Sequence, residues 1–446
     1  MWRSHYLSEV YSVIKSCNCY PTIPRCEGQP QFLLFLPLKV YLPELQELTM
    51  VPTISNSTKP AAIFLFIFFK YIHLFLENSQ LKLSPLLEKH QLPFKVLVAP
   101  LDWGLGHATR CVPLIRTLKQ AQCHVYVAGN PTALKLLQQE VTGVEYLPLD
   151  GYNIRYSSKR NMAWKILQQI PKIIRAIYKE HRWLQNMVTA HQISHVFSDN
   201  RYGLYHKDAT CIFITHQLRI KAPLSWLENV IQSINYRFIN RFDACWVPDY
   251  EGTLNIAGTL SHPKQLPSIP IQYVGPLSRL EVPSIHLSIQ YKWLILLSGP
   301  EPQRSILEQL LLQVINTVQF PVLLVRGLPL ESAELAAPPH CKVINHLPAK
   351  DLQLLFAQSE YIISRSGYTT VMEILALQRK SILIPTPGQT EQEYLAKHLM
   401  QQHWCYSFEQ HEDIAQHLQQ AQSFAYQLPQ LPGSTLQFAV EKVLQA

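Results

Sequence analysis

The chain has 446 residues, of which 47% are hydrophobic and 16% are charged, and its formal net charge is +8. This length is enough for two ordinary domains with substantial cores. The positive charge suits anionic substrates or an anionic membrane surface. The chain lacks basic runs with interleaved aromatic residues, so we expect no nucleic-acid partner.

The nine cysteines lack the spacing of a zinc site or of a disulfide framework. Four of them, Cys111, Cys123, Cys211 and Cys245, fall in or beside predicted apolar elements. They are interpreted as buried free thiols in a reducing compartment, which favours a cytoplasmic location.

Residues 1–93 differ from the rest because they show no repeated strand–helix rhythm. Their most apolar stretch, residues 61–76, is interrupted by Lys70 and His73. It is shorter than the roughly 20 residues of a spanning helix, and it fits a signal peptide poorly. Three interpretations remain: a membrane-proximal anchor, a disordered extension, or translation upstream of the true start. We favour the last, because a regular pattern begins cleanly at Phe94, and we assign this extension no function.

From Phe94 onward, short apolar runs alternate with helical patterns, which predicts parallel sheets with crossover helices. One long amphipathic helix or two shorter ones are expected over residues 162–189, with a break or kink at Pro171. The first doubly wound domain is therefore predicted over residues 94–275. Its strands are expected at residues 95–99, 124–128, 143–147, 195–198, 211–215 and 244–247.

A glycine loop, P-L-D-W-G-L-G-H-A-T-R, follows the first strand and contains Gly104 and Gly106. It matches neither a Walker A loop nor a dinucleotide fingerprint. His107 is its obvious general base, since an ordinary histidine pKa of about 6.5 suits proton abstraction near neutral pH. Two alternatives stay open: His107 caps the helix or binds phosphate, or Asp102 is the base. Arg110, one turn later, could meet an anionic acceptor group.

Polar side chains also follow the fourth and fifth predicted strands. Because such residues point into the cleft of doubly wound folds, we expect two or three of them to contact an acceptor. The candidates that we single out are Asp199, Asn200, Arg201 and His216.

A linker with two prolines is predicted over residues 276–291, directly after Gly275, and the strand–helix rhythm then restarts. A second doubly wound domain is expected over residues 292–430, followed by a C-terminal helix over residues 431–446. Two such halves imply a cleft between the carboxyl ends of two sheets. The second domain's strands are expected at residues 293–297, 322–325, 342–345, 361–363 and 381–384.

The most informative segment is residues 361–396. A short strand breaks at Ser364-Arg365-Ser366-Gly367, and a helix is predicted to start at Tyr368. Unpaired N–H groups and the helix dipole at such a turn bind phosphate well. Glu373, one turn after Thr369, could accept hydrogen bonds from ribose hydroxyls, or it could be an ordinary surface glutamate. A loop with Gln389, Glu391, Gln392 and Glu393 then follows the next strand and could hold a sugar.

This arrangement resembles the nucleotide-sugar donor site of GT-B glycosyltransferases, and most closely that of family 28. The resemblance is carried by S-R-S-G-x-x-T-x-x-E, then a strand, then P-x-P-x-x-x-x-Q. It implies an α/β, GT-B fold, with two Rossmann-like domains facing a cleft. The family's G-x-G-G-H segment, which faces the acceptor and the donor's reactive carbon, stands here as G-L-G-H.

The same resemblance assigns further donor-binding positions. Ser298 and Gly299 would offer donors to phosphate, and Arg326 could reach the diphosphate. His346-Leu347 occupies the place where family members read uracil with backbone groups. Gln392 matches a sugar-contacting glutamine. Glu393 and Ala396 depart from the family pattern, which leaves the donor sugar open.

The resulting hypothesis is an inverting transfer of a hexosyl group, N-acetylglucosamine by family default, from a UDP-sugar to an acceptor hydroxyl. We expect neither a cofactor nor a metal, since no D-x-D-type carboxylate pair stands out and the family works without one. The alternatives are a UDP-sugar epimerase on the same fold and a non-catalytic nucleotide-sugar-binding subunit. Glycan, lipid-linked and small-molecule acceptors all stay open, as does a peripheral contact with the inner face of the membrane.

Overall fold

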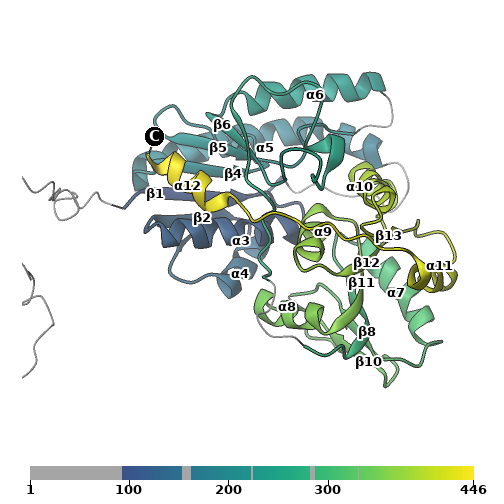
Figure 1. The fold of residues 1–446 in the computed structure, drawn as a ribbon. Helices are drawn as coiled ribbons and strands as arrows, with labels where there is room; N and C mark the ends of the chain where they lie inside the picture. The colour runs from purple at the N-terminus through teal and green to yellow at the C-terminus, as the bar shows by residue number, and fades with distance from the viewer. Residues whose placement is uncertain (1–92, 153–161, 222–224, 282–286, 330, 446) are drawn as a thin grey trace, which may run out of the picture. The chain divides into compact units, whose positions relative to one another are not determined.

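The computed structural model describes residues 93–152, 162–221, 225–281, 287–329 and 331–445 (Figure 1). The predictions for residues 1–92 lie outside the described residues, as does the middle of the predicted linker. None of the helices within these ranges combines the length and the apolar character needed to cross a bilayer.

The first sheet has seven parallel strands in the order β3-β2-β1-β4-β5-β6-β7. Its central strands are buried on both faces, as their continuous apolar runs predict. Strands β1 and β4 pair side by side, so their carboxyl ends, Pro100 and Asp199, lie opposite each other. The strands span Lys95–Pro100 (β1), His124–Gly129 (β2), Glu145–Pro148 (β3), His195–Asp199 (β4), Thr210–Ile214 (β5), Ala244–Val247 (β6) and Ile271–Tyr273 (β7).

Helices cover both faces of this sheet (Figure 1). Asn130 caps α4 by accepting a hydrogen bond from the Ala133 N–H, and Pro131 is the first helical residue. α5 runs without a break through Pro171, so the helix is not divided there. The helices span Leu105–Gln120 (α3), Pro131–Glu140 (α4), Met162–His191 (α5), Ser225–Ile239 (α6) and the short 3-10 helix Gly258–Leu260 (η2).

The second sheet repeats the same winding, with six parallel strands in the order β10-β9-β8-β11-β12-β13. Its strands span Tyr291–Leu296 (β8), Val322–Val325 (β9), Cys341–Ile344 (β10), Ser359–Ser364 (β11), Lys380–Leu383 (β12) and Tyr406–Ser407 (β13). Its helices span Gln303–Ile315 (α7), Ala349–Ala357 (α8), Tyr368–Ala376 (α9), Thr390–Gln401 (α10), Ile414–Gln420 (α11) and the 3-10 helix Ala421–Ser423 (η3).

The last helix, α12 (Leu436–Gln445), begins five residues after the predicted start and packs against α3 of the first domain (Figure 1). Its buried residues Leu436, Ala439 and Val440 belong to the first domain's core. The Thr435 N–H donates to the Val274 carbonyl oxygen at 3.2 Å, which holds the start of the helix. The C-terminal segment thus completes the core of the first domain.

Candidate active site

The turn after β11 leaves the N-terminus of α9 open. Gly367 is its N-cap residue, no side chain caps the helix, and no atom lies within 4 Å of the position where a Cβ on Gly367 would stand. The first-turn N–H groups therefore lack intrahelical partners and carry the positive end of the helix dipole.

The N-terminus of α3 is open in the same way and meets the first turn of α9. Gly104 is its N-cap residue, with a φ of 85° that favours glycine, and it also borders open space. The Thr369 hydroxyl donates to the Gly106 carbonyl oxygen at 3.1 Å. A Cβ on Gly106 would stand 3.2 Å from the Thr369 oxygen, so glycine permits this approach. Two uncapped helix N-termini thus converge, which suits an anionic ligand.

His107 lies in the first turn of α3, beside an aspartate from the end of β4. Its Nδ1 is 3.0 Å from Asp199 Oδ2, and Arg110 Nε lies 3.0 Å from both Asp199 oxygens. Burial would raise the pKa of Asp199, but Arg110 and His107 outweigh it and lower that pKa to about 2. Burial, and then Arg110, lower the pKa of His107 below its ordinary value, although Asp199 opposes them. His107 is therefore neutral near pH 7, as a general base must be.

A second histidine joins this cluster to the other domain. His216, just after β5, has its Nε2 2.7 Å from Glu391 Oε1 in the first turn of α10. Its Nδ1 lies 3.2 Å from Arg110 Nη1. The His216 ring stacks on Tyr368 with centroids 4.1 Å apart. In the described ranges no three or more His, Cys, Asp or Glu side chains are grouped to hold a metal ion. These acids and histidines are instead satisfied by one another and by Arg110.

Glu373, the predicted ribose ligand, is buried and already paired. Arg279 from the linker places its Nε 3.0 Å from Glu373 Oε1 and its Nη1 2.7 Å from Glu140 Oε1. Glu140, at the end of α4, also accepts a hydrogen bond from the Ala349 N–H at 2.9 Å. Burial raises the pKa of Glu373, against the opposing charge of Arg279. Glu373 is thus not the surface glutamate of the alternative interpretation, and its carboxylate is not free.

Three arginines predicted to bind substrate hold the fold together instead. Arg201 is fully buried and donates to the Pro100 and Asp150 carbonyl oxygens and to Glu180. Arg326 pairs with Glu308, with Nε 2.8 Å from Oε2. Arg365 donates to the carbonyl oxygens of Gln303, Ile384 and Pro385. These guanidinium groups satisfy strand-end carbonyls and buried carboxylates, so they are not free to meet an acceptor or a diphosphate.

The remaining first-domain candidates are placed as follows. Asp102, the rival base, accepts a hydrogen bond from the Tyr152 N–H at 2.9 Å and orders that loop. Asn200 follows Asp199 with a φ of 57° and is partly exposed. His107 contacts both Asp199 and Arg110, so we continue to favour His107 as the base.

The remaining donor-side candidates follow β8 and β11 or lie at the start of α10. Ser298 and the exposed Gly299 follow β8, which pairs with β11. The Ser366 hydroxyl donates to the Gln392 carbonyl oxygen at 2.8 Å, and Gln392 Oε1 accepts from the Thr386 N–H at 2.9 Å. Gln392 Nε2 also donates to Gln389 Oε1 at 2.5 Å, so this loop is ordered by its own amides.

His346 and Leu347 lie farther along, after β10, and both are partly buried. Burial and the charge of Arg279 lower the pKa of His346 below its ordinary value. The charge of Arg279 thus acts on His346 of the predicted uracil-reading turn, and the same arginine is paired with Glu373.

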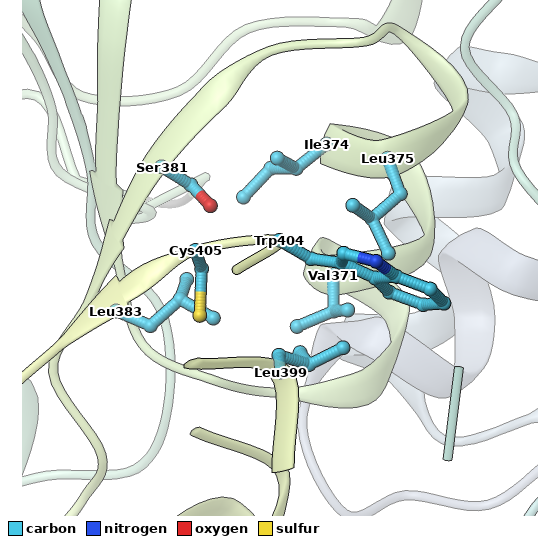
Figure 2. Close-up of a pocket in the computed structure, with 8 residues that line it drawn as sticks. All are labelled: Val371, Ile374, Leu375, Ser381, Leu383, Leu399, Trp404 and Cys405. Atoms are coloured by element: carbon cyan, nitrogen blue, oxygen red, sulfur yellow. The ribbon is translucent and has the colours of Figure 1, made fainter. Parts of the chain in front are cut away.

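Figure 2 shows an apolar gap in the second domain, and its lining residues do not include those of the His107 cluster. It has no volume that a water molecule could occupy, so it is a packing defect in the second domain's core rather than a substrate pocket. Its walls are Val371, Ile374 and Leu375 of α9, Ser381 and Leu383 of β12, and Leu399, Trp404 and Cys405.

Comparison with known proteins agrees with the fold. Residues 336–429 match the glycosyltransferase family 28 C-terminal domain. A structure described as the glycotransferase of kitacinnamycin is 14% identical and covers 74% of this chain and 90% of its own, with a TM-score of 0.51. The chain has the GT-B fold, and residues 336–429 form a glycosyltransferase family 28 C-terminal domain, which supports a glycosyltransferase. The predicted fold and the predicted resemblance are both confirmed.

Two further structures are similar to this chain. The calicheamicin glycosyltransferase CalG4 is 13% identical, covering 79% of this chain and 93% of its own, with a TM-score of 0.51. MurG from Acinetobacter baumannii is 14% identical, covering 79% and 99%, with a TM-score of 0.48. No curated protein matches this chain in sequence.

Proposed function

We propose that this glycosyltransferase moves a hexosyl group from a UDP-sugar to an acceptor hydroxyl, with inversion at the anomeric carbon. The observation that supports this most is the meeting of two uncapped helix N-termini, Gly104 of α3 and Gly367 of α9. A diphosphate placed there would face backbone N–H groups and two dipole ends. His107 lies next to Gly106, at the contact between the helices.

In this mechanism His107 takes the proton of the acceptor hydroxyl at Nε2. The hydroxyl oxygen attacks the anomeric carbon from the face opposite UDP, and the bond to the UDP oxygen breaks with its electron pair. The helix ends would stabilise the departing diphosphate, and one such preorganised donor can contribute about 2.7–4 kcal/mol. Asp199 would orient His107 and stabilise the imidazolium that forms. We propose that positive charge from the helix ends replaces a metal or cofactor.

Isothermal titration of the full chain with UDP, followed by UDP- and dTDP-sugars, tests the donor site. Gly367→Asp would place a carboxylate at the phosphate position, and we expect it to weaken UDP affinity at least tenfold. Gly367→Ala is the matched control, because its Cβ would meet open space at an ordinary φ of −69°. We expect its affinity to stay within about threefold of wild type. Absence of nucleotide binding by the wild-type chain would refute the proposal.

The same titration ranks the donor sugars, with N-acetylglucosamine as the starting expectation. Two further assays separate the alternatives. An epimerase would convert the bound UDP-sugar without any acceptor, which product analysis detects. A non-catalytic subunit would bind the UDP-sugar and release no UDP.

We also propose a peripheral contact with an anionic membrane surface through α5 and α6. Three exposed apolar residues, Ile170, Ile174 and Tyr178, recur four residues apart on α5, with exposed fractions of 40%, 41% and 69%. On α6, Val230 and Ile234 are 49% and 47% exposed. The helices are neighbours, because Ile177 of α5 and Phe238 of α6 belong to one apolar cluster.

The exposed charges of these two helices are basic, which favours an anionic lipid surface over a protein partner with mixed charges. Their only acidic residues, Glu180 and Glu228, are buried and paired with Arg201 and Arg219. The exposed charges of the described side chains are Lys172, Arg175, Lys179, Arg182 and Arg237. An apolar stripe flanked by basic residues is typical of helices that lie on anionic membranes. Such a contact would suit a lipid-linked acceptor.

A further inference from the structure

Tyr368, the first residue of α9, connects this helix to the first domain through its hydroxyl. The hydroxyl donates to the Pro248 carbonyl oxygen, just after β6, at 2.6 Å. Burial, and then the charge of Asp249, raise the pKa of Tyr368 well above its ordinary value, so the hydroxyl stays protonated. The ring lies flat on His216, with an angle of 4° between the two planes, and Tyr368 is only 3% exposed. Its side chain is therefore held at both the ring and the hydroxyl.

The loop that accepts this hydrogen bond is fixed by a buried aspartate. Asp249 accepts from the Ile256 N–H at 2.7 Å, from the Ala257 N–H at 3.0 Å and from the Ser261 hydroxyl at 2.6 Å. A buried carboxylate whose oxygens are satisfied in this way makes the surrounding backbone rigid. The loop after β6, residues 248–261, thus offers a preformed surface to the second domain.

A second tyrosine contacts the same loop from the next helix. The Tyr394 hydroxyl oxygen, on α10, accepts from the Thr259 N–H at 2.8 Å. Each of the helices α9 and α10 thus contacts residues 248–261 through one tyrosine hydroxyl. The two tyrosines differ in their place along the helix. Tyr368 adjoins Gly367 at the open N-terminus of α9, whereas Tyr394 lies in the second turn of α10.

The first turn of α9 therefore has two contacts with the first domain. Tyr368 binds the loop after β6, and the Thr369 hydroxyl donates to the Gly106 carbonyl oxygen at 3.1 Å. No side chain caps this turn, so the direction of its N–H groups depends on where the backbone of the turn is held. Hydrogen bonds to an anion weaken steeply when the donor is badly aligned. A diphosphate between α3 and α9 consequently needs both helix ends in their present places.

We propose that Tyr368 is a positioning residue of the donor site, which holds the first turn of α9 where its N–H groups face the diphosphate. This inference rests on the proposed function and deepens it. The helix end comes from the second domain, and the group that anchors it, the Pro248 carbonyl, comes from the first. Both domains thus build the diphosphate site, and UDP affinity depends on a buried hydroxyl bonded to the backbone of the first domain.

Isothermal titration of the full chain with UDP compares Tyr368→Phe with its matched control, Tyr394→Phe. Each variant keeps the ring and removes one hydroxyl that is bonded to residues 248–261. We expect the Kd for UDP to rise about fivefold in Tyr368→Phe, the size of one lost hydrogen bond. In Tyr394→Phe it should stay within about twofold of wild type. An unchanged Kd in Tyr368→Phe overturns the inference. Equal losses in both variants also overturn it, because they would reflect a general loosening between the domains.

Amide hydrogen exchange of the same full-length variants, without ligand, reports the position of α9 independently of UDP. We expect faster exchange in peptides that cover α9 in Tyr368→Phe, and in peptides that cover α10 in Tyr394→Phe. Exchange in α9 that is the same in Tyr368→Phe and wild type overturns the inference. A wild-type chain that binds no UDP refutes the proposed function instead, and the exchange result still decides whether Tyr368 holds α9.

Discussion

Arg279 Nε lies 3.0 Å from Glu373 Oε1, so a linker arginine occupies the carboxylate that is predicted to bind the donor ribose. Its Nη1 holds Glu140 of the first domain at 2.7 Å. One buried cation thus connects the donor helix, the linker and the first domain. A ribose hydroxyl that bound Glu373 at Oε1 would compete with Arg279.

Replacing Arg279 by alanine tests this competition. We expect UDP to bind at least about threefold more tightly by titration, because Glu373 no longer has to leave a partner. We also expect a less stable fold, by roughly 3–5 kcal/mol, since one partner of a buried ion pair is lost. Titration should be done where circular dichroism shows the variant folded. Weaker UDP binding would mean that Arg279 holds Glu373 in place for ribose.

Glu373→Ala should weaken UDP binding at least about tenfold if its carboxylate accepts the ribose hydroxyls. Glu140→Ala is the matched control, because Glu140 shares the same arginine but comes from α4 of the first domain. It should leave UDP affinity within about threefold of wild type. Equal losses in both variants would assign the effect to Arg279 and the linker rather than to Glu373.

The pH dependence of turnover follows from the pKa of His107. Burial and Arg110 lower that pKa below 6.5, and the base acts in its neutral form. UDP release from the tightest-binding UDP-sugar should therefore rise with pH through a midpoint below 6.5 and level off near pH 7. Asp199→Asn removes the anion that opposes this lowering, so the midpoint should move further down. A wild-type midpoint above 6.5 would contradict the assignment.

His107→Ala should lower the same turnover about 10²-fold or more, within the range that a general base contributes. UDP affinity should be largely kept, because the diphosphate is proposed to contact helix N–H groups rather than this ring. Asp102→Ala provides the comparison, since Asp102 is hydrogen-bonded to the Tyr152 N–H. A larger loss in Asp102→Ala than in His107→Ala would exchange their roles.

The structural role of Arg201 is tested by measuring the free energy of unfolding. Arg201→Ala leaves Glu180 without its buried cation, and burial already raises the Glu180 pKa to about 7. Urea unfolding at pH 8, where that carboxyl tends to ionise, should show a loss of roughly 3–5 kcal/mol. At pH 5 the carboxyl is protonated and the loss should be smaller. The exposed Arg182→Ala should change stability by less than about 0.5 kcal/mol at either pH.

Much of the fold could be predicted from sequence because the strands are continuous apolar runs buried on both faces. β7 and β13 were missed because three and two residues are too short to show a pattern. The sequence also predicts that His107, Asp199 and His216 lie close together. They follow strands of one parallel sheet, and parallel strands end at the same edge.

The sequence could not predict which side chains form hydrogen bonds or ion pairs with residues far away along the chain. Glu391 was recognised only as one polar residue of a loop, and it lies 175 residues from His216. Arg279 stood in a linker without periodicity, so nothing marked it as the partner of Glu373. For Arg201, Arg326 and Arg365 the pattern could not separate a substrate-binding arginine from one that satisfies buried carbonyl and carboxylate oxygens. Residue spacing predicts the strand or helix from which a side chain projects. Whether that side chain is available to a ligand depends on its burial and on its ion-pair partners.

The membrane contact is tested by substituting the apolar stripe of α5. Ile174→Glu with Tyr178→Glu removes two exposed apolar residues and adds two negative charges near Lys179 and Arg182. Binding of the full chain to vesicles with about a third anionic lipid should fall at least tenfold in flotation. Vesicle binding by wild type should also fall as the salt concentration rises, because screening weakens attraction to anionic headgroups.

The control is Phe438→Glu on α12, because this side chain is 66% exposed and lies outside the stripe. We expect this control to bind like wild type. If both variants bind vesicles equally well, α5 is not the contact, and a soluble acceptor is favoured over a lipid-linked one.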